Sequence, residues 1–294
     1  MASKVARKIA QSVLSKEQAE GAGARVRRSI GTRSLRNLDP FLMLDEFSVQ
    51  APAGFPDHPH RGFQTVTYML EGEFWHEDFK GHKGRIGPGD LQWMSAGKGI
   101  MHSEIPATNN KAHGLQLWVN LSAKDKLSEP NYQEYPATNI KSISPEEGID
   151  IKVIAGESYG VQSPVMTLTP TMYIDISLKK GKKVEQVIPK SFRGFVYTLS
   201  GTAMFGGDKH KAEAHHTLVL SDNGGTYLPV ESLSDDCRFV VIAGEPINEP
   251  IIQYGPFVMN TEQEIYQAFA DYEQGKNGFE GAPGWHSSIR DLWS

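Results

Sequence analysis

Residues 55–62 read FPDHPHRG, and residues 89–104 read GDLQWMSAGKGIMHSE. The first stretch contains His58 and His60, and the second ends in His102 and Glu104. In an extended chain the side chains of residues i and i+2 point to the same face, so each pair can aim two ligands at one point. Together the two pairs predict a single site with four ligands, three imidazoles and one carboxylate.

This donor set contains nitrogen and oxygen but no sulfur, which suits Fe, Mn, Ni, Cu or Zn. Structural zinc sites usually close with cysteine, and catalytic zinc usually takes three protein ligands. We therefore expect one iron ion per chain, octahedral with two open positions, and we keep other divalent transition metals as alternatives.

The remaining histidines lack this spacing. Adjacent His215 and His216 would point to opposite faces of a strand. The others have no matching ligand two residues away: His76, His82, His113, His210 and His286. We expect each of these side chains to lie at the surface or to be hydrogen-bonded.

Outside the two motifs, short alternating or apolar runs are separated by turn residues, with 29 glycines and 17 prolines in the chain. This pattern indicates a protein rich in β-strands. We expect strands over Phe41–Val49, Thr65–Glu71, Leu91–Ser95, Leu115–Leu121, Ile151–Ala155, Met172–Leu178, Phe195–Leu199, Thr217–Leu220 and Phe239–Ala243.

One helix is well marked, and it begins near Thr261. Thr261 and Glu264 form a capping-box pattern. Apolar residues then repeat at three- and four-residue spacing on one face, namely Ile265, Ala268, Phe269 and Tyr272. We expect this short C-terminal helix to pack on a sheet.

Length and composition limit the class of protein. A chain of 294 residues favours two domains, and 39% hydrophobic residues suffice for a large core. The single cysteine, Cys237, excludes an intramolecular disulfide, and the net charge of -5 argues against direct DNA binding. No secretion signal or membrane-spanning run is found, so we expect an intracellular protein.

A polar, breaker-rich stretch at residues 136–148 separates two strand-rich halves. We expect an N-terminal metal-binding domain over residues 1–135, a linker over 136–148 and a C-terminal domain over 149–294. Two echoes suggest duplication: Tyr68–Gly72 resembles Tyr197–Gly201, and Val153–Glu157 repeats as Val241–Glu245.

The two histidine motifs have the spacing of a cupin barrel. Together with two further runs, HGLQLWVN over residues 113–120 and YGPFVMN over 254–260, they resemble the pirin family over nearly the whole chain. This resemblance implies an all-β bicupin: two antiparallel cupin β-barrels, of which the N-terminal one holds iron and the C-terminal one lacks metal ligands. It also implies that His58, His60, His102 and Glu104 are the iron ligands.

The chain departs from the family pattern at one position. Gln64 stands where most pirins carry a glutamate shortly after the histidine pair. Because Glu104 supplies the fourth ligand in the resemblance, we expect metal binding to survive. The loss of a nearby negative charge could still shift the redox potential or the metal preference.

The resemblance implies two roles. One is a redox-responsive transcriptional co-regulator that binds iron and transcription factors in the nucleus and cytoplasm, with possible quercetin 2,3-dioxygenase activity. The alternative is primarily a flavonol dioxygenase, in which Glu104 accepts the hydroxyl proton and dioxygen adds to the ring. We expect a monomer with no membrane partner.

Several side chains around the motifs have two interpretations. Gln116 either faces the metal cavity or bonds a neighbouring strand, whereas Trp93 and Trp118 are expected in the barrel core. One dense basic stretch is either a solvated face or a partner-docking surface, and it contains Arg25, Arg27, Arg28, Arg33 and Arg36.

Overall fold

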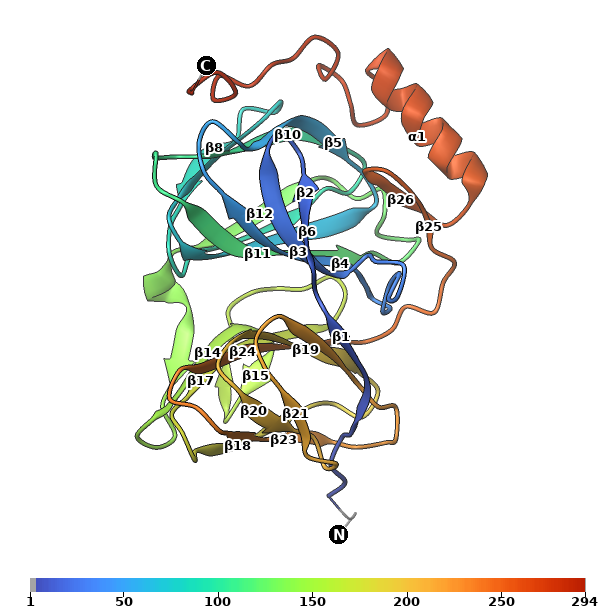
Figure 1. Cartoon of the computed structure of the whole chain (residues 1–294). Helices are drawn as coiled ribbons and strands as arrows, with labels where there is room; N and C mark the ends of the chain where they lie inside the picture. Colours follow the sequence, from blue (N-terminus) through green and yellow to red (C-terminus); the bar gives the residue numbers. More distant parts are fainter. Residues whose placement is uncertain (1–3, 294) are drawn as a thin grey trace. The chain divides into compact units, whose positions relative to one another are not determined.

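The computed structural model describes residues 4–293, which divide into two compact units. The N-terminal barrel comprises Glu17–Arg28, Phe41–Ala137 and the chain from Ile247 on. The C-terminal barrel comprises the chain up to Lys16, Ser29–Pro40 and Thr138–Pro246. Figure 1 shows that each unit consists almost entirely of strands.

The N-terminal barrel contains a seven-stranded and a four-stranded sheet with antiparallel pairing. The larger sheet has the order β12 (Asn131–Tyr135), β9 (Leu91–Ser95), β6 (Phe63–Glu71), β11 (Ala112–Asn120), β4 (Phe41–Val49), β3 (Ala24–Ile30) and β2 (Glu17–Glu20). The smaller sheet has the order β5 (Phe55–His60), β10 (Ile100–Pro106), β7 (Phe74–Asp78) and β8 (Lys83–Ile86). Phe47 of the larger sheet stacks on Phe74 of the smaller, so the two sheets share a core.

The C-terminal barrel repeats this plan. Its larger sheet has the order β1 (Ile9–Leu14), β22 (His216–Leu220), β19 (Arg193–Ser200), β24 (Cys237–Gly244), β17 (Thr171–Leu178), β14 (Ile149–Ala155) and β13 (Lys141–Ile143). Its smaller sheet has the order β18 (Lys183–Val187), β23 (Tyr227–Ser232), β20 (Ala203–Phe205) and β21 (His210–Ala212). A short hairpin, β15 (Glu157–Ser158) and β16 (Val161–Gln162), and a 3-10 turn at Ala137–Asn139 complete this part of the chain.

The predicted helix is confirmed as α1 (Glu262–Gln274). The side chain of Thr261 accepts a hydrogen bond from the backbone of Glu264, and the Glu264 side chain accepts one from the Thr261 backbone, which completes the capping box. The apolar face packs on the hairpin of β25 (Ile252–Tyr254) and β26 (Phe257–Met259), as Figure 1 shows. No helix within residues 4–293 is long and apolar enough to cross a membrane.

The nine predicted strands are all present, with ends that differ by at most three residues. The compact units, however, do not follow the division into residues 1–135 and 149–294 throughout. The C-terminal segment from Ile247 on belongs to the N-terminal barrel, and β1 pairs with β22 in the C-terminal barrel. A division at the linker would therefore assign both ends of the chain to the wrong unit, because the N-terminal end belongs to the C-terminal barrel and the C-terminal end belongs to the N-terminal barrel.

Candidate metal centre

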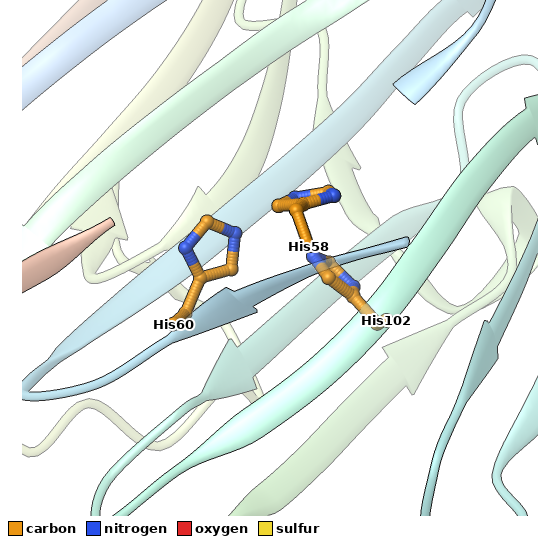
Figure 2. A group of neighbouring side chains, drawn as sticks. All are labelled: His58, His60 and His102. Carbon is orange, nitrogen blue, oxygen red and sulfur yellow. The ribbon is translucent and has the colours of Figure 1, made fainter. Parts of the chain in front are cut away.

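The strands β5 and β10 bring the two histidine motifs together. They pair antiparallel, with His58 opposite His102 and His60 opposite Ile100. Three imidazole rings then converge from the two strands, as Figure 2 shows. One ring nitrogen of each histidine lies within 4.8 Å of the others.

The nitrogen spacing fits a shared metal ion. The Nε2 atoms of His58 and His102 are 3.0 Å apart, and the ring of His60 lies 4.7 Å from that of His58 and 5.0 Å from that of His102, between centroids. Metal–nitrogen bonds of about 2.0–2.1 Å place two ligand atoms roughly 3 Å apart. The residues present therefore fit a divalent transition metal.

Burial keeps these imidazoles in the form that binds metal. His60 and His102 are almost fully buried, and His58 is partly buried. Desolvation lowers the pKa of His58, and it lowers the pKa of His60 and His102 well below the usual value. Neutral imidazole is the ligating species, so no proton has to be displaced from the rings at neutral pH.

Glu104 lies two residues after His102 on β10, but its carboxylate is not within the 4.8 Å group of ring nitrogens. The pairing of β10 with β5 shifts register between His102 and Glu104. The carboxylate accepts hydrogen bonds from Thr67 Oγ1 at 3.3 Å and Gln116 Nε2 at 3.2 Å. Burial raises the pKa of Glu104 to about 7, against the opposing effect of these two donors.

Gln116 fulfils both interpretations of its role, since it faces the site and also bonds a neighbouring strand. It faces Glu104 from β11, and its Oε1 accepts a hydrogen bond of 2.8 Å from Thr67 on the neighbouring strand β6. Thr67 was not recognised in the sequence. The feature that could have identified Thr67 is the pairing of β6 with β11, because this pairing places Thr67 directly opposite Gln116.

Trp93 is fully buried, as expected, and Trp118 packs against the buried apolar cluster of Leu42, Phe63 and Val258. The ring of Trp118 is only partly buried and lies 5.2 Å from the ring of His60, between centroids. Trp118 therefore forms an aromatic wall of the histidine site. Alternation along β11 puts it on the same face as Gln116.

Gln64 lies away from the metal-facing side of β6. It pairs with Val119, whereas Thr65 and Thr67 pair with Trp118 and Gln116. Its Nε2 donates to Ser95 Oγ at 2.6 Å. Because alternate residues point to opposite faces, a charge at this position would act on the metal only through the sheet. The expected effect on redox potential or metal preference is therefore small.

Two glycines form the turns that flank the ligands, Gly62 after His60 and Gly97 before His102. Gly62 has φ +89° and Gly97 has φ +49°. A Cβ atom would lie 2.0 Å from the Val258 carbonyl oxygen at the first position and 2.1 Å from that of Ser128 at the second. The Gly62 amide donates to the Gly97 carbonyl at 2.9 Å, which ties the turn after His60 to the turn before His102.

Arg61 connects the histidine strand to the C-terminal segment, and the sequence analysis missed it. Its guanidinium donates to Asp271 Oδ2 of α1 at 2.7 Å and to the Asn277 carbonyl at 2.8 Å. Its Nε donates to the Lys98 carbonyl at 2.7 Å. Arg61 and Asp271 are both buried. Their contact depends on residues 210 positions apart, so no local spacing reveals it.

Three of the five arginines in the basic stretch lie close to acids of their own unit. Arg25 pairs with Glu17 at 2.8 Å, and Arg28 pairs with Glu20 at 2.6 Å and with Asp45 at 2.7 Å. Arg27 lies 3.9 Å from Glu17. For these three arginines the pairing favours a solvated, internally paired face over a docking surface, whereas Arg33 and Arg36 are exposed.

Comparison with known families and proteins adds to this geometry. The family profile described as Pirin matches residues 23–119, and the profile described as Pirin C-terminal cupin domain matches residues 173–278. The chain is 54% identical over 287 residues to Pirin from Homo sapiens, which covers 96% of this chain and 98% of that protein.

Two solved structures show the same architecture. A quercetin 2,3-dioxygenase from Acinetobacter baumannii is 33% identical, with a TM-score of 0.86, over 94% of this chain and 99% of that one. A bacterial pirin from Escherichia coli in complex with nickel(II) is 19% identical, with a TM-score of 0.64, over 80% of this chain and 99% of that one. The expected all-β fold of two cupin barrels is confirmed.

Proposed function

This chain belongs to the pirin family, and from that membership we propose that its N-terminal barrel is an iron-dependent flavonol 2,3-dioxygenase. His58, His60 and His102 supply three ligands to the iron, and Glu104 supplies the fourth. The overall reaction adds both atoms of dioxygen to quercetin, breaks the two ring bonds of the carbon that carries the reacting hydroxyl, and releases that carbon with its own oxygen as carbon monoxide.

When bound, the iron supplies a Lewis-acid position for a flavonol oxygen and a redox centre for dioxygen. The protein side chains supply the proton chemistry. Glu104 accepts the proton of the flavonol hydroxyl, and its burial, which raises the pKa of the carboxyl in the metal-free site, favours this role as a base. Thr67 and Gln116 orient the carboxylate through their hydrogen bonds.

The observation that carries this proposal is the combination of three converging neutral imidazoles with a buried, proton-accepting carboxylate two residues away. The aromatic ring of Trp118 beside His60 offers a flat surface for a flavonol ring. The likeness to a solved structure named quercetin 2,3-dioxygenase supports the same substrate class.

The test is aerobic turnover of quercetin by protein that has been stripped of metal and reloaded separately with iron, copper, manganese or nickel. We expect quercetin and dioxygen to disappear together with at least one of these metals, and fastest with iron. Turnover no faster than that of the free metal, for every metal tried, would reject the enzymatic proposal.

The role as a transcriptional co-regulator in the nucleus and cytoplasm, with transcription factors as partners of a monomeric chain, stays a prediction. Its candidate docking surface now contains three arginines that are paired with acids. A redox switch would require a partner to bind the Fe(II) and Fe(III) forms with different affinities, typically by about 5- to 150-fold. Equal affinity of a transcription-factor partner for both forms would reject the switch.

A further inference from the structure

A second cluster of metal-ligating side chains lies in the N-terminal barrel, apart from the three histidines already described. It consists of His76 on β7, His82 in the turn after β7, and Glu134 on β12. Glu134 Oε1 lies 2.7 Å from His76 Nε2 and 3.2 Å from His82 Nε2. From their sequence spacing, both histidines are expected to be surface or hydrogen-bonded residues.

His76 is not at the surface, because its side chain is only 1% exposed, but it meets the hydrogen-bonded alternative through the contact of its Nε2 with Glu134 Oε1 at 2.7 Å. Its buried Nδ1 has no hydrogen-bond partner within residues 4–293. The short contact with Glu134 brings two potential ligand atoms, one imidazole nitrogen and one carboxylate oxygen, to the same point.

Neighbouring side chains hold the cluster in place. Asp78 Oδ1 accepts hydrogen bonds from the backbone amides of Lys80 and His82, both at 2.9 Å, which fixes the turn that carries His82. Asp78 Oδ2 accepts a bond of 2.9 Å from the Tyr132 hydroxyl. The Tyr132 ring stacks on the His82 ring at 4.1 Å between centroids.

The carboxylate is also held, and the cluster is open on one side. Gln92 Nε2 donates to Glu134 Oε1 at 2.8 Å from the paired strand β9. The side chains of His82 and Glu134 are 34% and 35% exposed. An ion could enter from solvent and keep a water molecule as a further ligand.

We propose that His76, His82 and Glu134 form a second metal site that binds zinc. Two imidazoles and one carboxylate are a known ligand set for zinc with water in the fourth position. The spacing of 2.7–3.2 Å between the carboxylate oxygen and the two nitrogens matches ligands that share one ion. The bound ion would join the turn after β7 to the edge strand β12.

The test measures zinc bound per chain by equilibrium dialysis and element analysis, with metal-free protein that carries no histidine tag. Six proteins are compared, and the first four are wild type, the double variant His58→Ala and His60→Ala, the variant His82→Ala, and all three substitutions together. His210→Ala, which removes a histidine from the C-terminal barrel, is the matched control. Glu134→Gln tests the carboxylate with little change of shape.

We expect the double variant to keep one zinc ion, and the triple variant to bind none. His82→Ala and Glu134→Gln should each lose one zinc relative to wild type, whereas His210→Ala should lose none. In the double variant, zinc should also raise the melting temperature, and His82→Ala should abolish that rise. Unchanged zinc content after His82→Ala, or a double variant without bound zinc, would overturn the second site. Because His82→Ala leaves His58 and His60 intact, failure here is distinguishable from failure of the iron centre.

Discussion

At the scale of single residues, Glu104 decides how the histidine site can act. It is 3% exposed and receives hydrogen bonds from Thr67 and Gln116. The substitution Glu104→Gln keeps the size of this side chain but removes its ability to take a proton. We predict that quercetin turnover at equal iron loading falls by roughly 10²- to 10⁴-fold.

The control for this substitution is Glu71→Gln, which changes an exposed carboxylate at the end of β6. Turnover by the control should match wild type. If Glu104→Gln retained wild-type turnover at equal iron loading, the carboxylate would not be the base.

The same carboxyl group makes the stability of the metal-free protein depend on pH. Its folded-state pKa of about 7 lies above the ordinary value of 4.5, so the folded chain binds the proton more tightly than the unfolded chain. This contribution to stability is fully present below about pH 4.5 and is lost as the pH rises through 7. It amounts to roughly 3 kcal/mol, from about 1.4 kcal/mol for each unit of pKa shift.

Urea unfolding of metal-free wild type and Glu104→Gln, from about pH 5 to about pH 8, measures this dependence. The free energy of unfolding of wild type should decrease with pH relative to that of the variant. Parallel curves would show that Glu104 keeps an ordinary pKa in the folded protein.

Much of the histidine site follows from the sequence, because the i and i+2 pairs need only an extended backbone to converge. The residues that could not be predicted act across strands. Thr67 reaches Glu104 because β6 pairs with β11, and the cluster of His76, His82 and Glu134 draws on three separate segments. Local spacing contains no information about such contacts.

At the scale of elements, the strands that carry the ligands were harder to recognise than the sheet behind them. β5 contains Pro56 and Pro59, which argue against a strand in the middle of a sheet. The two prolines are compatible with the strand because β5 lies at the edge of its four-stranded sheet. β10 is buried along its whole length, so it shows no alternation of polar and apolar residues.

Only one of the two sequence echoes reflects a repeated structure. Tyr68–Gly72 and Tyr197–Gly201 end β6 and β19, which occupy the same position in their two sheets, and Gly72 and Gly201 have φ values of 68° and 70°. Val153–Glu157 and Val241–Glu245, by contrast, begin on β14 and β24 of one sheet. That second echo is a coincidence between two strands of the same barrel.

The helix α1 supports the metal centre through the ion pair of Asp271 with Arg61. Removing one partner of a buried pair leaves an uncompensated charge, so we predict that Asp271→Ala lowers the free energy of unfolding by about 3–5 kcal/mol. Iron affinity should fall as well, because Arg61 is adjacent to His60. Chemical unfolding and iron titration measure the two effects.

The matched control is Glu273→Gln, which alters an exposed carboxylate on the same helix. Its effect on stability should stay within about 0.5 kcal/mol. A loss of less than about 1 kcal/mol in Asp271→Ala would contradict the supporting role of the helix.

At the scale of the whole molecule, the two barrels share one plan but differ in what faces their interiors. In the small sheet of the C-terminal barrel, β18 and β23 occupy the places that β5 and β10 hold in the N-terminal barrel. Their buried positions include the apolar residues Val184, Leu228 and Val230, whereas β5 and β10 carry three histidines. Within residues 4–293, both clusters of three potential metal ligands lie in the N-terminal barrel.

Composition could not predict that the N-terminal end of the chain belongs to the C-terminal barrel and the C-terminal end to the N-terminal barrel. The linker near residue 137 was visible as a polar, breaker-rich stretch, and it coincides with a boundary between the units. The assignment of α1 to the N-terminal barrel depends instead on contacts such as Arg61 with Asp271. These contacts join segments about 210 residues apart, which a division by sequence proximity always separates.

The central claim, a catalytic iron centre built by β5 and β10, is tested most directly by the carbon monoxide released per dioxygen consumed. The measurement uses iron-loaded wild type, His60→Ala and the control His210→Ala with quercetin in air. We predict equal molar amounts of carbon monoxide and dioxygen for wild type and the control, and no carbon monoxide above that of free iron for His60→Ala. Dioxygen consumption without carbon monoxide in wild type, or undiminished carbon monoxide in His60→Ala, would contradict the claim.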